Sequence, residues 1–141
     1  MTAEALPEAI ARAVESIRAS TTALLRATAG RVLFGDIGIF EQPVRGRQYC
    51  LDGYVFDGNC TALGIVDSIM YPGTDAFMRF EYPSHLPDAV QRRADSIATR
   101  FLQAIGFTHG LFNMEFIVDE QTGALRVIEF NPRLGAQFTD L

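Results

Sequence analysis

Two glutamates, an asparagine and an arginine lie close together near the end of this 141-residue chain. Apolar and polar side chains alternate over residues 110–117 and 127–131, and the turn-forming run 119–123 lies between them. This pattern predicts two antiparallel strands joined as a hairpin, with Glu115 opposite Glu129. Directly opposed carboxylates repel, whereas a hard divalent cation such as Mg²⁺ prefers carboxylate oxygens as ligands. The pair therefore predicts a cation site; the alternative is a solvent-exposed hairpin face followed by an Asn-Pro turn.

The same alternation assigns side chains to the two faces of the hairpin. On the first strand Glu115 shares its face with Asn113. On the second strand Val127, Glu129 and Asn131 share one face. We therefore expect Asn131 to lie on the same side as the two glutamates.

This stretch resembles the metal-binding end of the ATP-grasp family, in its biotin carboxylase-like and carboxylate-amine ligase branch. In that family a glutamate on one late strand and a Glu-x-Asn-x-Arg motif on the next hold the Mg²⁺ ions that bridge the ATP phosphates. Here the motif reads Glu-Phe-Asn-Pro-Arg at positions 129–133, with Glu115 as its partner. The resemblance implies that Glu115, Glu129 and Asn131 bind Mg²⁺ or Mn²⁺.

Three further residues take their roles from the resemblance. Arg133 matches the catalytic arginine that neutralises charge on the transferred phosphoryl group or acyl-phosphate, as a guanidinium can; the alternative is an ion pair with Glu129 or Asp140. Glu41 falls at the hinge position that binds adenine, where the alternative is an exposed acid at the end of a strand. Gln48 falls at the position that binds the ribose hydroxyls, where the family usually has glutamate; an amide also donates and accepts.

The chain contains no lysine, and all twelve of its basic residues are arginines. ATP-grasp enzymes hold the ATP phosphates with two lysines and a glycine-rich loop that precede the region matched here. We therefore expect residues 1–141 to be a single partial ATP-grasp domain that lacks these parts and the N-terminal substrate domain. Such a chain is either the C-terminal part of a longer enzyme or a reduced relative that does not bind ATP in the usual way.

Composition places the chain among ordinary globular proteins, with 48% apolar and 21% charged residues. A net charge of −5 argues against binding to nucleic acid or to an anionic membrane. No long apolar stretch and no signal-peptide pattern occur, so we expect a cytoplasmic protein without a membrane span. Cys50 and Cys60 are out of register for a disulfide and are predicted to be free thiols. His85 and His109 are predicted to lie in loops or at strand starts.

The periodicity of the rest of the chain predicts an α+β fold, with a mostly antiparallel sheet and helices packed on one side. Short turn signals separate the elements, including an Asp-Gly hairpin turn. The predicted helices are residues 4–28 and 88–105, and the predicted strands, beyond the final hairpin, are short runs at 32–34 and 38–41 and longer ones at 48–56, 60–70 and 75–81. Asp52, Asp67 and Arg79 lie on strands that could border the ligand cleft, which makes them candidate site residues. The alternative, which we favour, is that each is a solvated strand residue.

Two functions of different classes fit these observations. The first is the C-terminal portion of an ATP-grasp ligase, which activates a small-molecule carboxylate as an acyl-phosphate with MgATP and joins it to an amine or other nucleophile. The second is a non-catalytic binding or assembly module. Missing upstream strands would leave an unpaired sheet edge, so the second function favours a homodimer or pairing with another chain through that edge.

Overall fold

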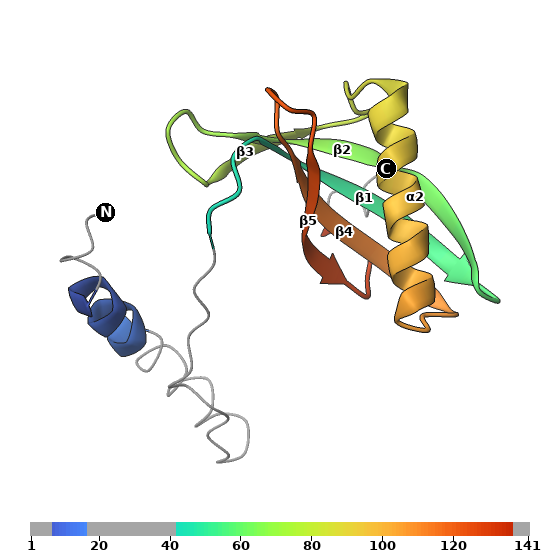
Figure 1. The fold of residues 1–141 in the computed structure, drawn as a ribbon, viewed down its shortest axis with the longest axis horizontal. Helices are drawn as coiled ribbons and strands as arrows, with labels where there is room; N and C mark the ends of the chain where they lie inside the picture. The colour runs from blue at the N-terminus through green and yellow to red at the C-terminus, as the bar shows by residue number, and fades with distance from the viewer. Residues whose placement is uncertain (1–6, 17–41, 137–141) are drawn as a thin grey trace, which may run out of the picture. The chain divides into compact units, whose positions relative to one another are not determined.

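The computed structural model describes residues 7–16 and 42–136 (Figure 1). The chain divides into two compact units, Met1–Gln42 and Pro43–Leu141. In the first unit residues 7–16 are α-helical, which is the early part of the helix predicted over 4–28. The remainder of that prediction and the two short runs at 32–34 and 38–41 lie outside the described residues. No helix of the described residues is long and apolar enough to cross a membrane.

The second unit is built on one five-stranded sheet, with strand order β3-β2-β1-β4-β5. Every neighbouring pair of strands is antiparallel. The elements in chain order are β1 (Arg47–Phe56), β2 (Asn59–Met70), β3 (Phe77–Glu81), α2 (Asp88–Ala104), β4 (Gly110–Val118) and β5 (Leu125–Asn131). The α+β class and the mostly antiparallel sheet are thus as predicted, and the predicted strands and second helix differ from the observed ones by two residues or fewer at each end.

A tight turn joins β1 to β2. Asp57 and Gly58 both have positive φ, at 50° and 74°. Positive φ at both central residues is the conformation of a two-residue hairpin turn, and Asp-Gly adopts it at low cost. The turn fixes the register of the pair, so that Cys60 lies opposite Val55. Because Cys50 lies opposite Val66, the two thiols are far apart along the ladder and both are free, as predicted.

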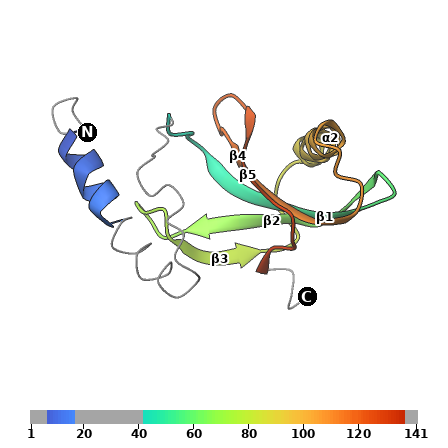
Figure 2. The ribbon, with the colours of Figure 1, turned by 90° about the horizontal axis from the view of Figure 1, so that it is seen from below.

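Helix α2 covers one face of the sheet (Figure 2). Its fully buried residues are Ala94, Ala98 and Leu102, which are spaced four apart and therefore form one stripe. They pack on a sheet core that includes Leu51, Phe112, Met114 and Phe116. The small side chains of the two alanines let the helix backbone approach these large residues closely. Ile97, next to Ala98, is only partly buried.

The loop between β3 and α2 is anchored to the helix-covered face by Asp67. One Asp67 oxygen accepts hydrogen bonds from Ser84 Oγ at 2.5 Å and the His85 backbone N–H at 3.3 Å, and the other lies 3.0 Å from His85 Nδ1. Asp67 is 5% exposed, so the prediction of a solvated strand residue is wrong for it. Alternation along β2 assigns a face but does not show that a following loop folds back over that face. Arg79 is exposed, as predicted, and pairs with Glu81.

The opposite face of the sheet carries polar residues. Gln48, Cys50 and Asp52 alternate along β1 on this face. Their partners across the β1–β4 ladder are Ile117, Glu115 and Asn113, respectively. Among residues 43–136, α2 is the one α-helix and lies on the other side (Figure 2), so no helix of this unit covers the polar face.

Candidate metal and nucleotide site

Glu115 on β4 lies directly opposite Glu129 on β5, as the sequence predicts. Two residues further along the ladder, Asn113 lies opposite Asn131, so Asn131 is on the same face as the two carboxylates. Between Glu129 and Val127 the register shifts, because Ile128 is an extra residue in β5. This bulge brings Val127 opposite Phe116, on the helix-covered side, so the prediction that Val127 shares a face with Glu129 is wrong.

The two glutamates differ in environment. Glu129 is exposed, whereas Glu115 is half-buried and its Oε2 accepts a hydrogen bond from Gln48 Nε2 at 2.5 Å. Burial raises the pKa of Glu115, and the Glu129 carboxylate raises it further. The Gln48 hydrogen bond and the positive charge of Arg133 act in the opposite direction. A cation bound between the carboxylates would remove the smaller part of this increase in pKa, which comes from the repulsion by Glu129.

Asp52 lies at the centre of a buried polar network below the acidic pair. It is 0% exposed, so the prediction of a solvated strand residue is wrong for it too. Its Oδ2 accepts a hydrogen bond from Asn113 Nδ2 at 2.9 Å, and its Oδ1 accepts one from the Gly135 backbone N–H at 2.5 Å. Asn113 Oδ1 in turn accepts a longer bond, of 3.4 Å, from Asn131 Nδ2. Alternation along β1 places Asp52 on the same face as Gln48, which is the one feature of this network that the sequence indicates. Only the pairing of β1 with β4 brings Asn113 next to Asp52.

The donor set fits a hard divalent cation. Glu115 and Glu129 offer carboxylate oxygens, and Asn131 uses its amide nitrogen towards Asn113, which leaves its amide oxygen available as a ligand. All three are oxygen ligands of the kind that Mg²⁺ and Mn²⁺ take. These residues are therefore the ones that would hold the metal.

Arg133 follows the end of β5 in an exposed loop. Its backbone N–H bonds to Asn131 O at 2.8 Å, and its side chain bonds to Leu134 O at 3.0 Å. Within the described part of the chain Arg133 makes no ion pair, and Glu129 is therefore not its partner; Asp140, the other alternative, lies outside the described residues. The guanidinium is close enough to lower the pKa of both Glu115 and Asp52, so its charge acts on the site.

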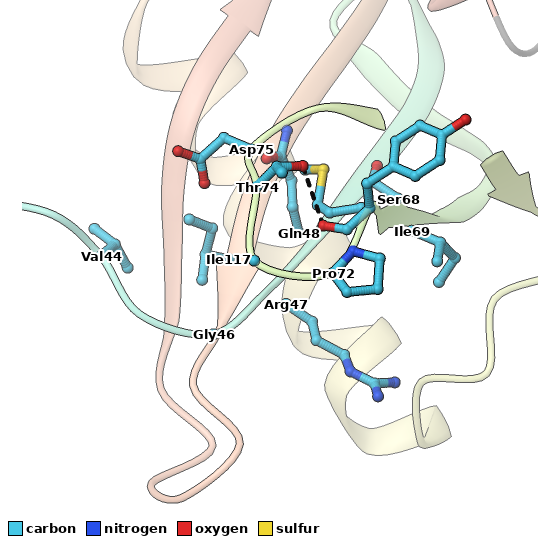
Figure 3. A pocket seen from close by; sticks show the side chains of 13 residues that line it. Val44, Gly46, Arg47, Gln48, Ser68, Ile69, Pro72, Thr74, Asp75 and Ile117 are labelled. Carbon is cyan, nitrogen blue, oxygen red and sulfur yellow. Dashed lines mark hydrogen bonds between the residues drawn. The ribbon is translucent and has the colours of Figure 1, made fainter. Parts of the chain in front are cut away.

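Gln48, the hydrogen-bond partner of Glu115, lines a pocket of about 440 Å³ (Figure 3). The pocket is lined by the start of β1, the end of β2 and the connection between β2 and β3, residues 71–75. Ile117 and Val44 contribute apolar surface, while Gln48 and Ser68 contribute polar groups. Gln48 thus lines the pocket and also bonds to Glu115. Glu41, the residue assigned to adenine, lies outside the described residues.

Glycine at position 46 is needed at the entrance to this pocket. Gly46 has φ +138°, and a Cβ atom there would collide with the Val118 backbone. The chain therefore enters β1 pressed against the end of β4, and this contact places Gln48 opposite Ile117.

Comparisons with known proteins bear on the same region. A family model described as the ATP-grasp domain matches residues 4–140. Among curated proteins, no sequence matches the chain. Solved structures do match: the biotin carboxylase of Campylobacter jejuni in complex with β,γ-ATP is 25% identical, with a TM-score of 0.59 over 69% of this chain and 22% of that one.

Two further structures extend the likeness. The L-amino acid ligase of Bacillus licheniformis is 22% identical, with a TM-score of 0.55 over 64% of this chain and 23% of its own. The biotin carboxylase domain dimer of Hydrogenobacter thermophilus 2-oxoglutarate carboxylase, in complex with MgADP and bicarbonate, is 25% identical, with a TM-score of 0.55 over 64% of this chain and 20% of its own. The chain thus spans less than a quarter of each of these proteins.

Proposed function

The chain belongs to the ATP-grasp domain family, and on that premise we propose that it is the C-terminal, metal-binding portion of an ATP-dependent ligase. The ligase activates a small-molecule carboxylate as an acyl-phosphate with MgATP and joins it to an amine or other nucleophile. The chain acts as one partial ATP-grasp domain of a cytoplasmic enzyme. The observation that carries this proposal is the pairing of Glu115 with Glu129, next to a pocket lined by Gln48, which is the hydrogen-bond partner of Glu115.

The metal ligands in this proposal are Glu115, Glu129 and Asn131. When bound, Mg²⁺ or Mn²⁺ supplies positive charge to the nucleotide phosphates. The protein's part is placement: the β4–β5 ladder sets the separation of the carboxylates, and the Gln48 bond holds one Glu115 oxygen while leaving the other free. Opposed positions on adjacent strands keep the two carboxylates near each other before any ligand arrives, which supports binding of a cation between them.

Arg133 is the proposed catalytic residue. It lies in the loop directly after Asn131, and it makes no ion pair within the described residues, so its charge is available to a ligand. A guanidinium presents a planar fork of donors that stays charged, which suits charge developing on a transferred phosphoryl group or an acyl-phosphate. The influence of its charge on the pKa of Glu115 supports a role for Arg133 beside the cation site.

The pocket next to the acidic pair is the proposed nucleotide site. Ile117 and Val44 supply apolar surface suited to the flat face of a base, and Gln48 supplies an amide that donates to and accepts from ribose hydroxyls. Glu41 is proposed to bind the adenine.

A non-catalytic module is the second candidate, and two observations favour it. The chain has no lysine to hold the phosphates. Among the described strands β3 is also an edge strand, and it exposes Phe77 and Phe80, whose tilted rings have centroids 5.3 Å apart. Such an edge suits pairing with a second copy or with another chain.

Calorimetric titration with Mn²⁺, with and without ATP, tests the proposed function. We expect the wild-type chain to bind Mn²⁺ and Glu115→Gln to lose most of that binding. Glu120→Gln is the matched control, because Glu120 is an exposed acid of the same hairpin that is not one of the proposed metal ligands and pairs with Arg47 instead. Equal Mn²⁺ binding by the wild type and both variants would reject the metal site and with it the ligase proposal.

A further inference from the structure

Asp52 is buried beneath the proposed metal site but is not one of its ligands. Both of its carboxylate oxygens are occupied: Oδ2 faces the Asn113 amide nitrogen at 2.9 Å, and Oδ1 faces the Gly135 backbone nitrogen at 2.5 Å. It is 0% exposed, and burial raises the pKa of its carboxyl group, whereas the Gly135 and Asn113 hydrogen bonds and the charge of Arg133 lower it. Burying a carboxyl group costs free energy unless hydrogen bonds compensate for the lost hydration. The bonds that Asp52 makes therefore indicate what its burial achieves.

Asp52 determines which way the side-chain amides of Asn113 and Asn131 point. Asn113 points its amide nitrogen at Asp52, because an oxygen there would meet another oxygen. The Asn113 amide oxygen is therefore left to face Asn131 and accepts from the Asn131 amide nitrogen at 3.4 Å. Two hydrogen bonds away from Asp52, the orientation of the Asn131 amide is thus determined: its nitrogen turns inward and its oxygen is left for a cation.

Asp52 also holds the backbone that follows the metal-binding strand. The Gly135 N–H bond closes a short loop that starts at Asn131 and contains Arg133. Gly135 is buried, in contrast to the exposed Arg133. The Asp52 carboxylate therefore contacts both the Asn113 amide and the loop that follows β5, although Asp52 lies 83 residues before Gly135 in the sequence.

We propose that Asp52 is a positioning residue that orients the Asn131 amide oxygen towards the cation and anchors the loop bearing Arg133. The proposal rests on the metal-binding role proposed for Asn131. Residues that orient a ligand from behind typically change metal affinity by about 10- to 100-fold when they are altered.

The test replaces Asp52 with its isosteric amide. In Asp52→Asn the new amide nitrogen faces Asn113, so the Asn113 amide rotates by about 180° to accept from it. The Asn113 amide nitrogen then points at Asn131. The Asn131 amide rotates in turn and directs its nitrogen, instead of its oxygen, towards the cation. We expect Mn²⁺ affinity to fall about tenfold or more. The double variant Asp52→Asn/Asn113→Asp restores an acceptor next to Asn131 while keeping every hydrogen bond, so we expect its Mn²⁺ affinity to recover towards that of the wild type.

Asp67→Asn is the matched control for a purely structural effect. Asp67 is also a buried acid of the same sheet, at 5% exposed, but it faces the helix-covered side and holds the β3–α2 loop. We expect this variant to lose stability and to keep wild-type Mn²⁺ affinity in its folded fraction. Unchanged affinity in Asp52→Asn, or an equal loss in Asp67→Asn, would overturn the proposal.

A readout without metal separates this proposal from the proposed function. The side-chain amide resonances of Asn131 and Asn113, followed by nuclear magnetic resonance, report which atoms face each other. We expect the Asn131 amide hydrogens to lie near Asn113 Oδ1 in the wild type and to lose that contact in Asp52→Asn. If the wild type binds no Mn²⁺, the metal site is rejected, and unchanged amide contacts in Asp52→Asn would reject the role of Asp52 independently.

Discussion

Gln48 Nε2 donates a hydrogen bond of 2.5 Å to Glu115 Oε2 across the pairing of β1 with β4. The bond connects the pocket to the acidic pair, because Gln48 lines the first and Glu115 belongs to the second. The amide at position 48 also adds no charge to a face that already carries Asp52, Glu115 and Glu129. This gives a physical account of glutamine at a position where the resemblance leads one to expect glutamate.

Gln48→Glu therefore should destabilise the metal-free protein. The new carboxylate would lie diagonally across the ladder at hydrogen-bond distance from Glu115, without a hydrogen to donate, and like charges at such close range on neighbouring strands cost up to about 1 kcal/mol. Urea unfolding in EDTA at pH 7.5 measures the loss. Mn²⁺ should reverse much of it, and equal stability of the two proteins in EDTA would contradict this account of Gln48. Gln121→Glu, in the exposed β4–β5 turn, is the control for an added charge elsewhere.

Glu115 should make stability depend on pH in a direction opposite to that of most carboxylates. Its pKa in the fold is raised above the ordinary value of 4.5, first by burial and then by Glu129. Between that value and the raised one the native state binds more protons than the unfolded state, so the contribution to stability falls as pH rises through this window. Unfolding in EDTA across the window should show this fall in the wild type, and a smaller fall in Glu115→Gln. Parallel profiles for the two proteins would exclude the effect.

Glu129→Gln should leave the stability of the metal-free protein equal or raise it slightly. It keeps the shape of the side chain and removes one of two opposed charges, which is worth a few tenths to about 1 kcal/mol for a cross-strand pair. Metal or metal–nucleotide binding should fall sharply at the same time, because Mg²⁺ prefers charged oxygens. Thermal melts of wild type and variant, with and without Mg²⁺, measure both properties. An equal response to Mg²⁺ would count against Glu129 as a ligand.

The chain by itself should bind MgATP weakly, with a Kd above about 1 mM, which corresponds to a binding free energy of about −4 kcal/mol. The lysines that hold the phosphates in the family are absent, and each charge-assisted hydrogen bond to a phosphate contributes about 1.5–3 kcal/mol. Calorimetry on the purified chain measures the affinity. A micromolar Kd would show that arginines, or a second chain, have replaced the lysines.

The hairpin that carries the acidic pair was predictable because its information is local. The alternation of β4 and β5 and the length of the turn place Glu115 opposite Glu129 by counting alone. The bulge at Ile128 was not predictable in this way, since an extra strand residue leaves no signal in composition. It reversed the face assigned to Val127 but left Glu129 and Asn131 in register.

Contacts between distant strands account for what the sequence did not reveal. Alternation places Gln48 and Asp52 on one face of β1, but nothing local states that β4 becomes the neighbour of β1. That pairing brings Asn113 to Asp52 and Glu115 to Gln48, and it turns Asp52 from an expected surface residue into a buried one. Asp67 was misjudged for a related reason, because the loop that covers it comes from after β3.

Cys50 on β1 lies opposite Glu115 on the polar face of the sheet and is 2% exposed. Burial raises the pKa of its thiol to about 11. Since thiol reagents attack the accessible thiolate, Cys50 reacts only when the sheet transiently opens, whereas Cys60 on β2 is partly accessible throughout. The labelling rate of Cys50, divided by that of Cys60, therefore measures how often the strands around the site separate. A ligand that joins β4 to β5 should lower this ratio without contacting the thiol.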